Sequence, residues 1–404
     1  MALALSRNLL RTEPPPIAEV NALAADLERR GRSLVDLGQA VPDWPPPSPA
    51  IARLAGLLSD PLLHRYAPDP GLPALRHAWA AVLSERWGQA VDPEGGLLVT
   101  AGANMAYLVA TLGILDPGDR VALPVPWYFN HAMATTLVGA EVVPVPLAAQ
   151  DGFDLDPDRL LATARAEDCK AVTVVTPNNP TGVTADPEAL DALAAGLDRD
   201  GRWLLVDETY APFADPARGH RPPRGERVVL LGSFSKAFSL TGWRVGYLAA
   251  APEVVAQFLK IQDTMVICAP RPGQALVVAC LETAGGWIEE KRAELADRGR
   301  AFDAAAAALG AWTVRAQGSF FAWIEGPPGS DGRTAARQAL ETEGVVTVPG
   351  CAFGPGLDRG LRLSLGCAPA AVLTDGLVRL GRVLNAGPSG RGAGGAGSGS
   401  NAIS

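Results

Sequence analysis

Two apolar runs and the segment between them decide the fold: Lys170-Ala-Val-Thr-Val-Val-Thr176, Asp186-Pro-Glu-Ala-Leu-Asp-Ala-Leu-Ala-Ala-Gly196 and Arg202-Trp-Leu-Leu-Val-Asp207. The two runs are short and rich in valine and leucine, which is typical of buried strands, and Arg227-Val-Val-Leu-Leu231 has the same character. The segment between them starts with Asp-Pro and has a glycine near its end, which predicts a helix. Strands that alternate with helices of this length predict an α/β fold with a mainly parallel sheet sandwiched by helices.

Polar residues follow three of these strands directly. They are Pro177-Asn-Asn-Pro-Thr-Gly182, Asp207-Glu-Thr-Tyr210 and Ser233-Phe-Ser-Lys236. Ligands of parallel sheets bind at the carboxyl ends of the strands. The sequence therefore predicts one ligand site that is built from these three segments.

The chain changes character after about residue 272. A segment rich in Ala, Glu and Arg, from Gly286 to Leu309, predicts a helix, and the strand-like runs Ser319-Phe-Phe-Ala-Trp-Ile324 and Leu361-Arg-Leu-Ser-Leu365 follow. We expect a smaller α+β domain here, formed by the N-terminal segment and the C-terminal third. The expected division is 1–37 for that N-terminal segment, 38–272 for the large domain, 273–385 for the small domain and 386–404 for a disordered Gly/Ser-rich tail.

The amino-acid composition limits which partners the protein binds and in which cell compartment it is expected. The chain has 404 residues and a formal net charge of -8, which argues against nucleic acid or an anionic membrane as a partner. Its five cysteines and four histidines lack metal-ligand spacing, and we see no signal peptide, so we expect a cytoplasmic protein without a metal site. The uncharged run from Leu97 to Leu115 is broken by Gly102, Asn104 and Gly113, so a strand, a loop and a helix are expected there rather than a membrane span.

Lysine is rare in this chain. Of the 35 basic residues, four are lysine (positions 170, 236, 260 and 291), which leaves 31 arginines. Lys236 lies between Phe234 and Phe238, just past a strand. Only lysine loses its proton when it is desolvated and then forms an imine, because arginine stays charged. On these features alone, a reactive lysine and a surface lysine at a strand end both remain open.

The segment around this lysine resembles a cofactor motif. Ser233-Phe-Ser-Lys236 followed by Thr241-Gly-Trp-Arg244-Val-Gly246 is similar to the cofactor-lysine signature of the class I and II aminotransferases, which are pyridoxal-phosphate enzymes of fold type I. The resemblance implies that Lys236 holds pyridoxal 5'-phosphate as a Schiff base and that Ser233 and Arg244 bind its phosphate. The chemistry agrees, because arginine donates two parallel hydrogen bonds to phosphate oxygens.

Three further segments resemble the family's contacts to the cofactor ring. In Asn178-Asn179-Pro180-Thr181-Gly182, the resemblance implies that Asn179 bonds the ring hydroxyl oxygen, which Tyr210 shares. Asp207 matches the aspartate that keeps the ring nitrogen protonated, so that the ring withdraws electrons better. Tyr128, in Pro126-Trp-Tyr-Phe-Asn-His131, aligns with the aromatic residue that stacks on the ring. Since two aromatic residues are adjacent here, Trp127 could be the stacking residue instead.

The remaining matches concern the phosphate, the substrate and a second subunit. Thr100-Ala-Gly102-Ala103-Asn104 resembles the loop that offers backbone N–H groups to the phosphate at a helix N-terminus. Arg362 matches the arginine that binds the substrate α-carboxylate, alongside Asn179 and Gly38 of the substrate loop. Tyr66 matches the tyrosine that one subunit lends to its neighbour's phosphate, so the resemblance implies a homodimer with shared active sites.

Taken singly, each of these residues has an ordinary explanation as a turn, a helix cap, a packing aromatic or a surface arginine. Together they all follow strand ends and serve one ligand. The resemblance implies transamination between an L-amino acid and a 2-oxo acid by a ping-pong route, with Lys236, Asp207 and Tyr210 as catalytic residues.

Two alternatives stay open. A C–S β-lyase, a cyclase or an oxidase of the same fold would share these cofactor contacts. A regulator that uses the domain as a ligand sensor would carry a DNA-binding module ahead of it, for which the residues before Asp36 leave no room. The substrate is also open: no clear second arginine serves a dicarboxylate side chain, although Arg271 could, and this favours neutral or aromatic donors.

Overall fold

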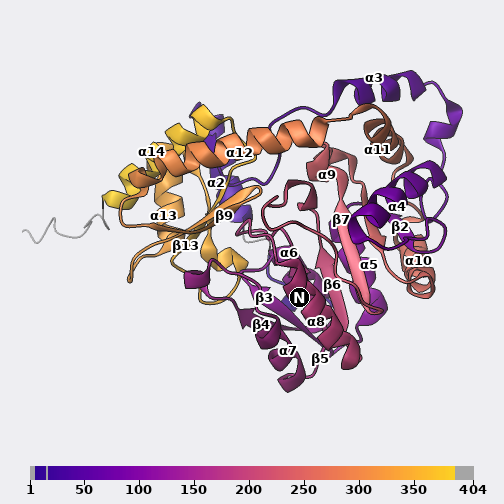
Figure 1. Cartoon of the computed structure of the whole chain (residues 1–404). Coiled ribbons are helices and arrows are strands. Elements are labelled where there is room, and N and C mark those ends of the chain that lie inside the picture. Colours follow the sequence, from indigo (N-terminus) through magenta and orange to yellow (C-terminus); the bar gives the residue numbers. More distant parts are fainter. Residues whose placement is uncertain (1–4, 15–16, 387–404) are drawn as a thin grey trace, which may run out of the picture.

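A seven-stranded sheet forms the centre of the larger part of the protein (Figure 1). The computed structural model describes residues 5–14 and 17–386, so all but the first residue of the predicted 386–404 tail lies outside the described residues. The strands in spatial order are β2 (Leu97–Thr100), β8 (Gly246–Ala249), β7 (Val228–Ser233), β6 (Trp203–Asp207), β5 (Cys169–Val175), β3 (Arg120–Val125) and β4 (Glu141–Pro146).

The strands β7, β6, β5, β3 and β4 run parallel, and β8 runs antiparallel to both of its neighbours. The prediction of a mainly parallel sheet between helices is confirmed. The three strands expected from valine- and leucine-rich runs are β5, β6 and β7, each within two residues of its expected bounds. The uncharged run from Leu97 to Leu115 forms β2, a turn and helix α5 (Ala103–Ile114), as expected.

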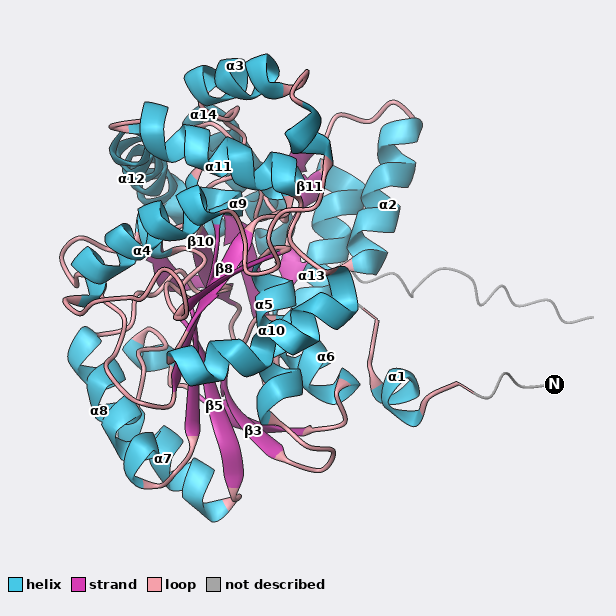
Figure 2. Cartoon of the chain, turned by 90° about the vertical axis from the view of Figure 1, so that its right-hand side faces the viewer, coloured by secondary structure: helices cyan, strands magenta, loops and turns pink. Residues whose placement is uncertain are grey.

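Helices cover both faces of this sheet, and alternate strand residues pack against one layer or the other (Figure 2). In β6, for example, Leu204 and Val206 face one layer while Leu205 faces the other. The first layer contains α3 (Ser48–Leu57), α4 (Pro73–Trp87), α7 (Pro157–Ala166), α8 (Pro187–Arg199), α9 (Phe234–Ala237) and α11 (Arg271–Thr283). The second contains α5, α6 (Phe129–Leu137) and α10 (Pro252–Val266).

Helix α8 shows how local sequence sets an element. Asp186 caps its start, because its carboxylate accepts hydrogen bonds from the backbone N–H groups of Glu188 and Ala189. The glycine that we expected near the helix end, Gly196, instead lies within the helix, which continues to Arg199. A Cβ atom on Gly196 would lie 2.5 Å from Leu161, so this glycine allows α7 and α8 to pack closely.

The C-terminal third forms a second, smaller part, in which helices pack against an antiparallel sheet (Figure 1). The predicted helix from Gly286 to Leu309 is α12 (Trp287–Ala305) followed by a 3-10 turn, Ala306–Leu309. The other elements are α13 (Gly332–Gln338), α14 (Ala370–Asn385) and an antiparallel sheet in the order β12 (Val348–Pro349), β13 (Gly360–Ser364), β10 (Phe321–Glu325) and β9 (Thr313–Gly318).

Part of the N-terminal segment contacts this smaller part, whereas residues 7–11 pack against α6 of the larger part. The short strand β1 (Val35–Asp36) pairs in parallel with β11 (Val345–Val346), and α1 (Arg7–Arg11) and α2 (Ala18–Arg29) precede it. Helix α11, which begins at Arg271, packs against α3 and α4 in the core of the larger part. The exact domain boundaries stay a prediction. Within residues 5–14 and 17–386, no helix combines the length and apolar character needed to cross a membrane.

Candidate active site

A cavity of about 240 Å³ opens where the carboxyl ends of β5, β6 and β7 meet the start of α5. Most of the residues singled out from the sequence line it. They are Ala103, Asn104, Tyr128, Asn179, Asp207, Tyr210, Ser233, Lys236, Arg244 and Arg362. The three strand-end segments therefore come together as predicted, joined by Arg362 from the smaller part.

Lys236 lies on α9, the short helix that follows β7. Ser233 caps this helix, because its hydroxyl oxygen accepts the backbone N–H of Ser235 at 3.1 Å. Burial lowers the pKa of Lys236 to about 8, and the nearby charges of Arg362 and Arg244 act in the same direction. The neutral form, which acts as a nucleophile or a base, is therefore far more populated near physiological pH than in an exposed lysine.

Asp207 lies at the end of β6, with one carboxylate oxygen hydrogen-bonded and the other close to His131, whose Nε2 makes no hydrogen bond among the described residues. One oxygen accepts the backbone N–H of Thr209 at 2.9 Å, and the other lies 3.1 Å from Nε2 of His131. Both side chains are buried, and the His131 ring stacks on Tyr107 with centroids 4.1 Å apart. A carboxylate held in this way suits a cationic partner group in the cavity.

Sequence reasoning missed His131 as a site residue. It lies on α6, three residues after Tyr128, so a helix that starts at Phe129 carries both toward the same side. That spacing within Pro126-Trp-Tyr-Phe-Asn-His131 is the signal that could have identified it.

The start of α5 forms one end of the cavity. Gly102 is its N-cap, with φ of 86°, and leaves the first backbone N–H groups of the helix free of side-chain caps. A Cβ atom on Gly102 would lie 2.4 Å from Nη2 of Arg244, so only glycine lets this guanidinium approach the helix start. Helix N–H groups beside an arginine and two serines, Ser233 and Ser235, fit a phosphate group. Ser235 was also missed, although it stands inside the Ser-Phe-Ser-Lys motif.

Arg362 of β13 brings a guanidinium from the smaller part to the cavity. Its guanidinium is buried between Phe321 and Phe353, about equally far from both rings at 5.0 and 5.1 Å. Nη1 donates to the side-chain oxygen of Asn179 at 2.8 Å, and Nη2 donates to the carbonyl of Gly38. Nη1 and Nη2 each carry a second hydrogen, so the guanidinium keeps donors for a carboxylate, whereas Nε is buried without a partner among the described residues. Gly38 thus acts through its carbonyl and does not line the cavity itself.

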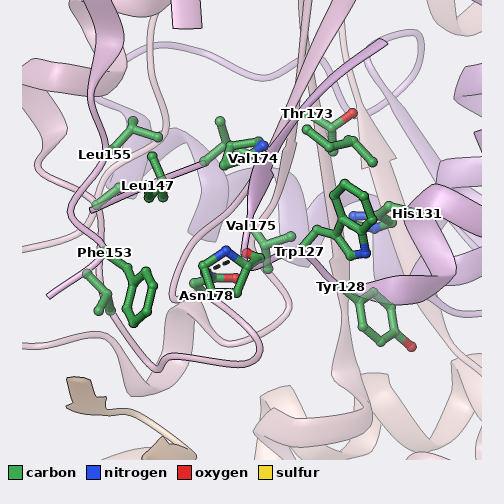
Figure 3. A pocket seen from close by; sticks show the side chains of 15 residues that line it. Trp127, Tyr128, His131, Leu147, Phe153, Leu155, Thr173, Val174, Val175 and Asn178 are labelled. Carbon is green, nitrogen blue, oxygen red and sulfur yellow. Dashed lines mark hydrogen bonds between the residues drawn. The ribbon is translucent and has the colours of Figure 1, made fainter. Parts of the chain in front are cut away.

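Of the two adjacent aromatic residues, Tyr128 lines this cavity and Trp127 does not. The Trp127 side chain lines a smaller neighbouring pocket with Leu147 and Phe153, and the Tyr128 hydroxyl points away from those two residues (Figure 3). Asn130 donates a hydrogen bond to that hydroxyl at 2.8 Å. Of these two residues, Tyr128 is therefore the one that shares a cavity with Lys236.

Tyr66 lies outside the cavity of its own chain. Its side chain is 72% exposed, and its carbonyl accepts a hydrogen bond from Arg271 at 2.6 Å. Arg271 does not line the cavity either. Within one chain, neither residue is brought to the other predicted site residues.

The lining of the cavity also includes apolar side chains. They include those of Ile17, at the start of α2, with Ala40, Val41 and Phe129. Among the described residues, Arg244 and Arg362 are the arginines that line the cavity. No further arginine there faces the space for a substrate side chain.

Comparison with known proteins identifies the family. A family model described as aminotransferase class I and II matches residues 32–379. The chain belongs to the class I and II aminotransferases. This confirms the resemblance drawn from the motifs, and with it the prediction of an aminotransferase.

The relatives of this aminotransferase cover nearly its whole length. It is 36% identical to aromatic aminotransferase ISS1 of Arabidopsis thaliana over 372 residues, 90% of this chain and 91% of that protein. It is 30% identical to aspartate/prephenate aminotransferase of Thermus thermophilus, over 86% of this chain and 91% of the relative. A solved aspartate aminotransferase of Thermus thermophilus superposes with a TM-score of 0.86 at 30% identity, covering 95% of this chain and all of that one. Family membership implies pyridoxal phosphate as the cofactor and amino acids and oxo acids as substrates.

Proposed function

We propose that this aminotransferase binds pyridoxal phosphate through Lys236 and takes its amino group from an apolar or aromatic L-amino acid. The observation that carries the proposal is the position of the Lys236 amine, in one cavity with the Asp207 carboxylate and an anion-binding helix start. When bound, the cofactor supplies an electron sink for the substrate α-carbon. The protein supplies the contacts, the orientation and the proton carrier.

Two sets of residues in the cavity would each hold one anionic group. The N–H groups at Gly102, Ala103 and Asn104 with Ser233 and Arg244 would hold the phosphate. Arg362 would hold the substrate α-carboxylate, and Lys236 lines the same cavity. This arrangement would point the α C–H bond at Nζ of Lys236, which is able to take the proton because its pKa is about 8.

The cofactor ring would occupy the space between these two sets of residues. Tyr128 would stack on the ring, and Asp207, oriented by His131, would keep the ring nitrogen protonated. The side-chain oxygen of Asn179 accepts from Arg362, which leaves its amide NH₂ to donate to the ring hydroxyl oxygen. Burial raises the pKa of Tyr210, so its hydroxyl stays protonated and would donate to the same oxygen.

The substrate preference rests on the apolar wall formed by Ile17, Ala40, Val41 and Phe129. A second carboxylate placed against this wall would lose its hydration without a cationic partner. A relative that is 36% identical is named an aromatic aminotransferase, which supports the same class of donor. Negative net charge and five cysteines outside any disulfide suit a cytoplasmic enzyme.

A panel of amino donors tests this preference. We expect kcat/KM for phenylalanine to exceed that for aspartate by roughly 100-fold, because a buried polar group without a partner costs about 1–3 kcal/mol or more. The rate of 2-oxo acid release in a single half-reaction, without an added acceptor, gives kcat/KM for each donor. Val41→Ala should lower kcat/KM for phenylalanine more than for alanine, and Val372→Ala, an exposed valine on α14, should change neither. A preference for aspartate would contradict the proposal.

We also propose a homodimer in which Tyr66 completes the partner's phosphate site. An exposed tyrosine that lies outside its own cavity supports this, as do exposed leucines nearby, Leu58 and Leu62. A residue lent in both directions requires the two-fold arrangement of identical surfaces.

Subunit mixing tests the shared site. Tyr66→Phe removes a hydrogen bond to a charged group, worth about 1.5–3 kcal/mol, and should weaken cofactor retention by roughly 10- to 100-fold. At limiting cofactor, a mixture of Tyr66→Phe and Lys236→Ala subunits should recover about a quarter of wild-type activity, since half of the dimers then hold one intact site. With unshared sites this mixture stays inactive.

The matched control mixes wild type with subunits that carry both substitutions. Shared sites again give about a quarter of the activity, whereas unshared sites give about half. Sedimentation of a fully active monomer would contradict the dimer.

A further inference from the structure

The segment of residues 38–44, the substrate loop, forms one wall of the cavity through Gln39, Ala40 and Val41. Backbone hydrogen bonds hold it at its upstream end, where Leu37 donates to Val346 at 3.0 Å and accepts from Ser364 at 2.7 Å. Those bonds tie the start of the loop to the strands β11 and β13. The wall itself needs a second anchor downstream, because a loop held at one end has many conformations.

Arg298 of α12 supplies that anchor. Its guanidinium is buried, with 2% of the side chain exposed, and lies 2.8 Å from a carboxylate oxygen of Asp43. It also lies over the Trp44 ring, 4.9 Å from the centroid, and Nη1 donates to the carbonyl of Leu365. The backbone N–H of Asp43 donates to Gly366 at 3.2 Å, so the end of the loop is joined to the residues just after β13.

The surroundings of Arg298 favour a role in geometry. A buried arginine paired with partly exposed carboxylates contributes little net stability, whereas the contact constrains the direction of its partners. Glu294 shares the guanidinium, and Trp44 packs against Phe213 and Phe320 with ring centroids 6.2 and 5.8 Å away. These contacts hold the end of the loop to α12 and to the core of the smaller part.

The same strand carries the substrate arginine. Arg362 of β13 donates to the carbonyl of Gly38 at the start of the loop, and Arg298 binds the carbonyl of Leu365 just beyond the strand. The loop is therefore clamped to one strand at both ends. Any shift of the loop moves the Gly38 carbonyl and, with it, the guanidinium that faces the substrate.

We propose that Arg298 is a positioning residue for substrate-carboxylate recognition, acting through the substrate loop on Arg362. The inference rests on the proposed function in one respect, which is the role of Arg362 as the carboxylate contact. Arg298 itself does not line the cavity. Its removal therefore acts on substrate binding through the geometry of the loop.

Arg298→Met tests the proposal in the holoenzyme. We expect KM to rise by about 10- to 100-fold for both the amino acid and the oxo acid, with kcat and cofactor retention nearly unchanged, because misplacement of a contact by about 1 Å costs on this scale. Arg298→Lys should recover part of the loss by restoring the charge opposite Asp43. Arg300→Met, an exposed arginine on the same helix, is the matched control and should change nothing.

Two comparisons separate positioning from general destabilisation. An amine that resembles the donor but lacks its carboxylate should react slowly and equally with wild type and Arg298→Met. In an Arg362→Leu background, Arg298→Met should cause little further loss, because both act on one contact. Equal losses for the amine, or fully additive losses in the double variant, would overturn the proposal.

The proposed function and this inference fail in different ways. If Arg362→Leu left the KM for carboxylate substrates unchanged, the proposed role of Arg362 would be wrong. If that KM rose and Arg298→Met had no effect, only the positioning role would be wrong. Should Arg298→Met fold poorly, Asp43→Asn weakens the same contact from the loop side and must give the same KM pattern.

Discussion

Replacing Lys236 with alanine should abolish both the covalent cofactor bond and transamination while the protein remains folded. The proposed mechanism uses this one amine twice, to bind the cofactor and to carry the α-proton. A positioned base alone contributes about 10²–10⁴-fold to a rate, so we expect a loss of roughly 10⁴-fold or more. The side chain sits at the cavity rather than in the apolar core, so the free energy of unfolding should change little.

Lys236→Arg sharpens this test. It keeps the positive charge and most of the volume but has no accessible neutral form, so it should be as inactive as Lys236→Ala. Borohydride reduction followed by mass spectrometry of the peptide measures the covalent bond. Lys260→Ala, which removes an exposed lysine of α10, is the matched control and should keep wild-type labelling and activity. Borohydride-dependent labelling that persisted in Lys236→Ala would exclude Lys236 as the cofactor lysine.

Asp207→Asn should leave the cofactor bound and slow the half-reaction by roughly 10³-fold, about 4 kcal/mol. The amide keeps the shape of the side chain and can still accept the Thr209 N–H bond. It lacks the negative charge that holds a proton on the ring nitrogen, so the electron sink is weakened. Single-turnover kinetics with a saturating amino donor measure the loss without interference from the second half-reaction.

Two variants interpret the result. His131→Phe keeps a ring that can stack on Tyr107 but removes the nitrogen that lies 3.1 Å from Asp207, so it should cause a smaller loss than Asp207→Asn. Asp215→Asn changes an aspartate that caps a nearby turn outside the cavity, and it should leave the half-reaction unchanged. Near-normal turnover in Asp207→Asn would mean that its carboxylate only accepts the Thr209 N–H bond.

The sequence by itself determined the framework of the fold and the reactive end of the site. Short valine- and leucine-rich runs are typical of strands that are buried on both faces of a sheet. They predicted β5, β6 and β7, with bounds correct to within two residues. Asn179, Asp207 and Lys236 each follow such a run, and parallel strands bring such residues to one edge of the sheet. The motif around Lys236 then predicted the family, because its spacing serves one ligand.

Only the tertiary structure decided which neighbours complete that site. Arg362 meets Asn179 across 183 residues and Gly38 across 324, and no local pattern encodes such contacts. The choice of Tyr128 over Trp127 depends on which side chain faces the cavity. Neighbouring residues at a strand-to-helix turn point in different directions, and the packing around them selects the direction.

The tertiary structure also brings two further residues beside carboxylates at and near the cavity. His131 beside Asp207 and Arg298 beside Asp43 carry no distinctive motif, because a buried polar side chain takes its role from the partner that the fold brings to it. The residues that line the cavity have side chains with distinctive chemistry, so the sequence alone is enough to single them out. The residues that contact them from behind are distinguished only by where they lie in the fold. Their positions depend on packing, so the sequence alone does not single them out.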